Sequence, residues 1–239
     1  MTFTLGVGVF GITNGVAISP DGLVLATAHG NQIAVLWERA TGRVVRRFEG
    51  HSGSVSAVAF APDGRALATG SDDKTARLWD TATGRETRRF EGHSGSVSAV
   101  AFAPDGRALA TGSHDKTARV WDTATGRETR RFEGHSSVVF AVAFAPDGQT
   151  LATSSVDGTI RLWDVRSARE LVRIHHMDNT ARLVVYGDGR SYWGSDGAEG
   201  FLSLVQALEA QPIPDAYRAR YFGLKTLLEA RRMLGLSET

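Results

Sequence analysis

The chain of 239 residues contains no cysteine. This absence excludes a disulfide framework, a thiolate metal site, an iron–sulfur cluster and a cysteine nucleophile. There is also no run of about 18 apolar residues that would suit a membrane-spanning helix. The first residues show no basic segment followed by an apolar stretch and a cleavage-like site, so we expect a cytoplasmic protein without membrane partners.

The chain carries no excess of charge of either sign. It has 27 basic and 26 acidic residues, a formal net charge of +1, which argues against a dedicated nucleic-acid binder. Lysine is scarce, with three of the 27 basic residues, and a preference for arginine is typical of a GC-rich, bacterial genome. The 42% hydrophobic and 22% charged content is that of a globular protein with one large domain, or one domain and a tail.

The chain repeats itself with a period of 42 residues. Tryptophan recurs at 37, 79, 121 and 163, and Gly-His recurs at 50–51, 92–93 and 134–135. Segments 51–92 and 93–134 differ at two of 42 positions, where Asp72 becomes His114 and Leu78 becomes Val120. Such similarity indicates that the repeats share one structure.

Within a repeat the apolar residues alternate with a period of two, which is typical of β-strands. Turn-forming residues such as Pro62-Asp63-Gly64 divide each repeat into four short strands, which in the second repeat are expected over 54–60, 65–71, 75–80 and 85–90. One such antiparallel sheet cannot bury both of its faces. The sequence therefore predicts sheets that stack on one another.

Gly50-His51, Trp79-Asp80 and the repeat length resemble WD40 repeats over about residues 1–205. The resemblance implies an all-β, WD40-type β-propeller of about five four-stranded blades, near 9–50, 51–92, 93–134, 135–176 and 177–205. A strand at 2–7 aligns with 44–49 and is expected to complete the last blade and close the ring. An open arc that dimerises, or a fragment of a longer protein, remain alternatives, and a solution mass twice that of one chain would exclude a closed monomer.

The resemblance also implies a buried polar tetrad in each blade, made of a histidine, a serine on the second strand, a turn aspartate and the tryptophan. In this chain the tetrads are His51, Ser71, Asp73 and Trp79; His93, Ser113, Asp115 and Trp121; and His135, Ser155, Asp157 and Trp163. In the first repeat the corresponding positions are Val9, His29, Asn31 and Trp37. Only the tryptophan survives there, which predicts a broken network. The fifth repeat is degraded, with a strand expected at 182–186 and Leu204 in place of tryptophan.

Residues 206–239 form a different segment. After a linker at 211–215, apolar residues such as Tyr217, Leu224 and Leu228 recur at helical spacing, which predicts an amphipathic C-terminal helix over about 216–234. This helix either packs on its own propeller or docks a partner. Residues 189–202 and the tail also resemble the C-terminal ends of bacterial multidomain WD40 proteins.

In WD40 propellers a partner binds beside the mouth of the central channel, and the resemblance carries this surface to nine positions. They are Ser56, Ser98 and Phe140; Asp72, His114 and Val156; and Arg77, Arg119 and Arg161. The three arginines are expected to converge on an acidic or phosphorylated peptide. The alternative is that each arginine pairs with a neighbouring aspartate such as Asp72.

Other chemistry has weaker support. Ser, His and Asp recur in three repeats, which one active site does not require, and no Gly-x-Ser-x-Gly elbow occurs. His175-His176 with Asp178 lacks the spacing of a metal site. The basic pairs at 46–47, 88–89 and 130–131 are typical of a charged outer edge. We therefore expect a non-catalytic protein-interaction scaffold without cofactor or metal. A self-assembly module and a hydrolase-type propeller are the alternatives.

Overall fold

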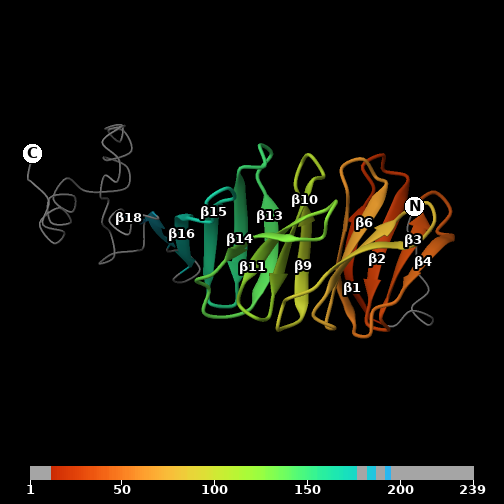
Figure 1. Cartoon of the computed structure of the whole chain (residues 1–239), viewed down its shortest axis with the longest axis horizontal. Helices are drawn as coiled ribbons and strands as arrows, with labels where there is room; N and C mark the ends of the chain where they lie inside the picture. The colour runs from red at the N-terminus through yellow and green to blue at the C-terminus, as the bar shows by residue number, and fades with distance from the viewer. Residues whose placement is uncertain (1–11, 177–181, 187–191, 195–239) are drawn as a thin grey trace, which may run out of the picture. The chain divides into compact units, whose positions relative to one another are not determined.

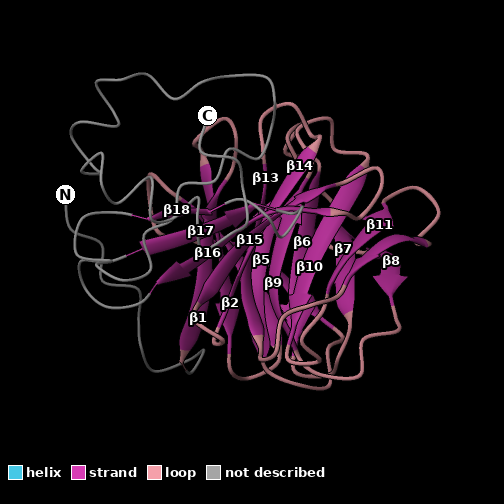
Figure 2. Cartoon of the chain, turned by 90° about the vertical axis from the view of Figure 1, so that its left-hand side faces the viewer, coloured by secondary structure: helices cyan, strands magenta, loops and turns pink. Residues whose placement is uncertain are grey.

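The computed structural model describes residues 12–176, 182–186 and 192–194. These residues form β-strands joined by turns and short loops (Figure 2), which confirms the predicted all-β class for this part of the chain. The chain divides into two compact units, residues 1–157 and 158–239, and each is treated by itself. The predicted closing strand 2–7, most of the fifth repeat and the C-terminal helix lie outside the described residues.

The first unit contains three antiparallel four-stranded sheets, each with its strands in sequence order (Figure 1). We call these sheets blades 1, 2 and 3. Blade 1 comprises β1 (Thr13–Ile18), β2 (Val24–His29), β3 (Ile33–Glu38) and β4 (Val44–Glu49); blade 2 comprises β5 (Val55–Phe60), β6 (Ala66–Ser71), β7 (Ala76–Asp80) and β8 (Glu86–Phe90); blade 3 comprises β9 (Val97–Phe102), β10 (Ala108–Ser113), β11 (Ala118–Asp122) and β12 (Glu128–Phe132). A hairpin of β13 (Val139–Phe144) and β14 (Thr150–Ser155) begins the fourth repeat.

The second unit is an antiparallel meander. Its strands are β15 (Thr159–Asp164), β16 (Glu170–His176), β17 (Arg182–Tyr186) and β18 (Tyr192–Gly194). In sequence, β13 to β16 repeat the four strands of each blade, so β1 to β16 correspond to four repeats of four strands. β17 coincides with the strand predicted at 182–186.

The Pro-Asp-Gly turns fix the first hairpin of each blade. In blade 2 the Asp63 carboxylate accepts the Arg65 backbone N–H at 2.9 Å. Gly64 has φ +72° and donates its N–H to the Ala61 carbonyl at 2.9 Å. A left-handed backbone favours glycine there. This local chemistry sets the register in which Leu67 lies opposite Phe60.

The core lies between blades, not within one. Trp79 of blade 2 packs with Leu36 and Phe48 of blade 1, and the Phe48 and Trp79 ring centroids lie 5.7 Å apart. The equivalent Phe90 and Trp121 rings join blades 2 and 3 at 5.8 Å. Each seam therefore removes the apolar faces of two sheets from water, which is the main stabilising contribution to a stack of this kind.

Arginines of the outer strands also bridge neighbouring blades. Arg46 of β4 donates to the Thr83 carbonyl of blade 2 at 3.3 Å, and Arg88 of β8 donates through Nε to the Ala124 carbonyl of blade 3 at 2.7 Å. The charged outer edge expected at these basic pairs therefore also makes contacts between repeats.

Close approach of the blades requires glycine at Gly70 on β6. A Cβ built there would lie 2.9 Å from both Cγ1 and the carbonyl oxygen of Val97 on β9, and 3.1 Å from Val100. Gly112 meets β13 in the same way. These glycines lie on the second strand of one repeat and let the first strand of the following repeat pack closely against it.

We predict that Gly70→Ala lowers the free energy of unfolding by about 1–3 kcal/mol, because Val97 backbone must shift to admit the methyl group. Gly30→Ala is the matched control, since the nearest atom to its Cβ is 3.8 Å away and its backbone is not left-handed. We expect the control to change stability by less than about 1 kcal/mol. Urea unfolding followed by tryptophan fluorescence measures both, and equal effects would contradict the close-packed seam.

Candidate functional site

One edge of the stacked sheets brings together two segments of each repeat. In blade 2 the turn after β6 meets the segment that leads into β5, because the Asp72 N–H donates to the Ser54 carbonyl at 2.9 Å. The same bond recurs from His114 to Ser96 at 2.9 Å and from Val156 to Val138 at 3.0 Å. We call this edge the upper face.

A buried chain of hydrogen bonds lies below the upper face in blade 2. The Trp79 indole N–H donates to the Thr69 hydroxyl at 2.9 Å, and that oxygen lies 2.7 Å from His51 Nε2. His51 Nδ1 lies 2.7 Å from the Asp73 carboxylate. An ionised Asp73 places the proton on Nδ1, so that Nε2 accepts the Thr69 hydroxyl and every group has a partner.

The full arrangement recurs in blade 3, and its histidine, aspartate and threonine recur in the fourth repeat. His93 lies 2.7 Å from both Asp115 and Thr111, and Trp121 donates to Thr111 at 2.9 Å. In the fourth repeat His135 lies 2.8 Å from both Asp157 and Thr153. Trp163, in the second unit, is 2% exposed.

The structure corrects the serine of the predicted tetrad. Ser71 donates to the Gly53 carbonyl at 3.0 Å and accepts the Asp73 N–H at 3.1 Å, while Thr69 receives the indole. The register explains the exchange, because Leu67 lies opposite Trp79 and Thr69 is the next residue on that face. Ser113 and Ser155 make the same bonds as Ser71. The alternation Thr-x-Ser in the sequence already indicates two hydroxyl groups on one face of the strand, and either of them could receive the indole N–H.

The three predicted partner-binding arginines are buried, which makes that expectation wrong. Arg77 is 5% exposed, donates to Glu86 at 2.7 Å, and lies 3.5 Å from Asp73 and 6.0 Å from the centre of the Trp79 ring. Its ion-pair partners also differ from the alternative, Asp72. Arg119 pairs with Glu128 at 2.8 Å and Arg161 with Glu170 at 2.7 Å. The glutamate partners do not follow from the spacing in the sequence, because the pairing depends on the bulge that places Glu86 opposite Trp79.

The buried arginine also explains the Gly-His dipeptide. Gly50 has φ +148°, and a Cβ there would lie 2.7 Å from Arg77 Nη1. Gly92 relates to Arg119 in the same way at 2.8 Å. The absence of a side chain at the glycine therefore leaves room for the guanidinium, and the histidine that follows joins the hydrogen-bond network.

Blade 1 rebuilds part of the network that its sequence predicts to be broken. The Trp37 indole donates to Thr27 at 2.7 Å, and Thr27 lies 2.7 Å from His29 Nε2. The imidazole now comes from the end of β2, at the position of Ser71. Val35 and Val44 replace the Arg77–Glu86 ion pair and pack with Trp37. The prediction that only the tryptophan of the network survives in the first repeat is therefore wrong, because Trp37 keeps a threonine and a histidine as partners.

The environment of the networks in blades 1 and 2 shifts the pKa of Asp73, His51 and His29. Burial raises the pKa of Asp73, but hydrogen bonds from Thr75, His51 and the Ser52 backbone outweigh it and lower the pKa to about 2. Burial lowers the pKa of His51 against the opposing effect of Asp73, and burial alone lowers that of His29. The blade 2 network therefore holds a neutral His51 beside an ionised Asp73 at neutral pH.

The remaining predicted positions differ between repeats and lie on the upper face. Ser56 donates to Asp72 at 3.3 Å, which shows that these two positions are neighbours. Ser98 instead donates to the Val139 carbonyl at 2.7 Å, and His114 is exposed. In the fourth repeat the same two positions are Phe140, 51% exposed, and Val156, 66% exposed. The structure thus brings a polar pair and an apolar pair to one surface.

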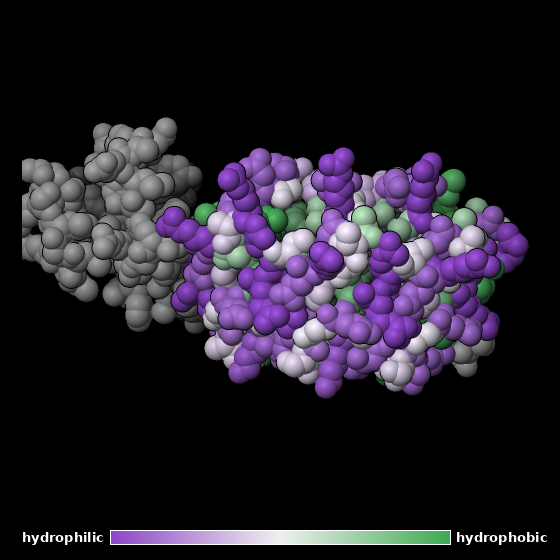
Figure 3. Space-filling view, in the orientation of Figure 1, coloured by the Kyte–Doolittle hydropathy of each residue, from purple (hydrophilic) through white to green (hydrophobic). Residues whose placement is uncertain are grey.

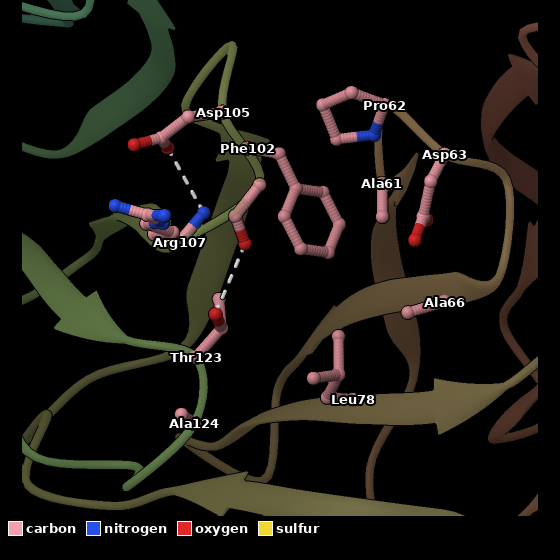
Figure 4. Close-up of a pocket in the computed structure, with 11 residues that line it drawn as sticks. Ala61, Pro62, Asp63, Ala66, Leu78, Phe102, Asp105, Arg107, Thr123 and Ala124 are labelled. Carbon is pink, nitrogen blue, oxygen red and sulfur yellow. Dashed lines mark hydrogen bonds between the residues drawn. The ribbon is translucent and has the colours of Figure 1, made fainter.

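The opposite edge of blades 2 and 3 contains a cleft of about 300 Å³. Figure 4 shows Phe102 and Leu78 at its centre, between the turns at 61–63 and 105–107. Two of its polar groups already stabilise the turn at 105–107. Asp105 accepts the Arg107 N–H at 2.9 Å, and Thr123 donates to the Gly106 carbonyl at 3.0 Å. The cleft is a gap between two turns with an apolar floor.

Neither a metal cluster nor a membrane helix is found in the described part of the chain. Among residues 12–176, 182–186 and 192–194, no three His, Asp or Glu residues are grouped to hold a metal ion. In the same ranges no helix combines the length and apolar character needed to cross a membrane.

The repeated blades and their networks agree with a comparison to known families. The family model described as IFT122 first beta-propeller matches residues 13–182, from the start of β1 to the start of β17. The chain belongs to this propeller family. No match is found among the curated proteins. A propeller of the WD40 type is generally a protein-interaction scaffold and is typically non-enzymatic.

We predict that Thr69→Val lowers the free energy of unfolding by about 1–3 kcal/mol, since it leaves the Trp79 indole and His51 Nε2 buried without a partner. Thr87→Val is the isosteric control on the exposed outer strand β8. Chemical unfolding followed by tryptophan fluorescence checks both. A loss in the control as large as that in Thr69→Val would contradict the central role of the threonine.

The networks also predict a loss of stability in acid. Unfolded histidine binds protons near pH 6.5, above the lowered pKa of His51, and unfolded aspartate near 3.8, above the pKa of about 2 for Asp73. The unfolded state therefore holds more protons in both windows, and the free energy of unfolding falls as pH drops. Asp73 accounts for about 2 kcal/mol of this loss.

Urea unfolding of the wild type and Asp73→Asn across this pH range tests the assignment. The stability difference between them should be largest near neutral pH and shrink below pH 3.8. A difference that stays constant with pH would show that Asp73 contributes no linkage.

Proposed function

We propose that this propeller is a non-catalytic scaffold that binds a protein or peptide partner on its upper face. The observation that carries the proposal is where near-identical repeats differ. Of the two positions that distinguish segments 51–92 and 93–134, one is the exposed pair Asp72 and His114. The other, Leu78 and Val120, is a buried exchange of apolar side chains.

The fourth repeat supports a binding surface. Phe140 and Val156 replace Ser56 and Asp72 at positions shown to be neighbours, and both are more than half exposed. Large apolar side chains with this exposure suit contact with an apolar group of a partner. The upper face therefore combines an apolar pair in one repeat with charged residues in the others.

Two lysines on this face support the same function. Lys74 and Lys116 are exposed and have φ of 70° and 72°, where glycine is favoured, and the fourth repeat has Gly158 at this position. A lysine in this conformation costs about 1 kcal/mol relative to glycine. The two exposed amines suit contact with an acidic group of a ligand. The partner we propose carries an apolar side chain beside charged ones.

The sharpest test restores residues that the chain itself uses. Phe140→Ser with Val156→Asp gives the fourth repeat the Ser56 and Asp72 of blade 2, so the double variant should fold with an unchanged melting temperature. We expect capture of the partner from a lysate of the source organism to fall at least about tenfold, because the apolar contact is lost.

The control is Arg127→Glu, an exposed charge change at the opposite edge, beside the turn between β11 and β12. It should capture the partner as the wild type does. A captured protein is then purified and titrated directly against all three forms. Undiminished binding by the folded double variant would remove Phe140 and Val156 from the binding site.

A further inference from the structure

Each blade has two different apolar faces. In blade 2 one face, with Val58, Phe60 and Trp79, packs against blade 1. The other face, with Leu78 and Phe90, packs against blade 3. We call these the leading and the trailing face. The seam between blades 1 and 2 and the seam between blades 2 and 3 use equivalent residues, so one kind of interface is used at least twice in the chain.

The leading face of blade 1 has no blade of the first unit against it. Blade 1 and the β13–β14 hairpin stand at opposite ends of that unit's row of sheets (Figure 1). Val16 and Ile18 occupy the positions of Val58 and Phe60. They are 64% and 60% exposed, whereas Val58 is 9% exposed.

Substitutions make this end face more apolar than the interior leading faces. Leu23, 66% exposed, lies at the margin of this face, at the position of the exposed Arg65. Val35 and Val44 occupy the positions of Arg77 and Glu86 and pack with Trp37, and Val35 is fully buried there. Figure 3 shows a few hydrophobic side chains, in green, among hydrophilic ones on the side where Figure 1 draws blade 1. The exposed part of the face is therefore formed by Val16 and Ile18, and neighbouring exposed apolar side chains of this kind mark an interface.

We propose that the leading face of blade 1 binds the trailing face of a second copy of this chain. In the interior of the chain each leading face packs against the trailing face of the preceding repeat, so a trailing face is the surface that fits the leading face of blade 1. Every copy carries such a face in its fourth repeat, where Ile160 occupies the position of the buried Ala34, Ala76 and Ala118 and is 45% exposed. The contact is head to tail, since two different faces meet.

Solution mass measured by light scattering over a range of concentrations tests the proposal on the full chain. We expect the wild type to have at least twice the mass of one chain. Ile18→Arg should reduce it to one chain, because the side chain at this position is packed in blades 2 and 3. Leu23→Arg is the matched control and should still associate, since blade 2 carries Arg65 there.

Mixing two defective variants tests the head-to-tail direction. Ile160→Arg alters the trailing face, so it should also have the mass of one chain. An equimolar mixture of Ile18→Arg and Ile160→Arg should form two-chain complexes, because each variant retains one intact face. If Ile18→Arg does not fold by circular dichroism, Val16→Ser with Ile18→Ser replaces it.

Three results would overturn the proposal. They are a wild type with the mass of one chain at every concentration, an Ile18→Arg variant that associates like the wild type, and a mixture that stays at one chain. Dissociation of the Leu23→Arg control would also contradict blade-like packing. The proposal is independent of the upper face, since Phe140→Ser with Val156→Asp should leave the mass unchanged.

Discussion

A four-stranded sheet with two apolar faces cannot bury either face alone, and the architecture of this chain follows from that constraint. Trp79 on one face of blade 2 needs Phe48 of the blade before it, and Phe90 on the other face is the partner of Trp121 in the blade after it. Stability is therefore shared between neighbours and no blade is an independent folding unit. The apolar face of a sheet at the end of the row is subject to the same constraint, because no neighbouring sheet of the row buries it.

The hydrogen-bond network gives each blade a fixed upper edge. Asp73 accepts not only His51 but also the backbone N–H groups of Ser52 and Thr75, so one carboxylate holds both segments of the edge. Residue 72 stands next to this carboxylate yet takes no part in these bonds. Its side chain can therefore change between repeats while the backbone stays in place, which separates the framework from the surface that it presents.

The sequence predicted the elements of the fold because the repeat, the period of two and the Pro-Asp-Gly turns are local signals. It did not predict which hydroxyl receives the indole, because Thr69 and Ser71 share a face and only the register separates them. The resemblance to WD40 repeats placed Arg77 on the partner-binding surface, whereas a bulge in the β7–β8 pairing supplies Glu86 as the partner of a buried Arg77. The role of His29 was not predicted, because its imidazole reaches Thr27 from the position that Ser71 occupies in blade 2 and not from the position of His51.

Blade 1 shows how one repeat framework serves both interior and end positions. The interior blades fill the space beside the tryptophan with a buried ion pair, which costs the desolvation of both charges. Blade 1 fills the same space with Val35 and Val44, which carry no charge and therefore have no such desolvation cost. An apolar pair of this kind can substitute for an ion pair at little cost in stability. It keeps Trp37 packed although the upper network is only partly rebuilt, and it gives the end blade a leading face suited to burial against another sheet.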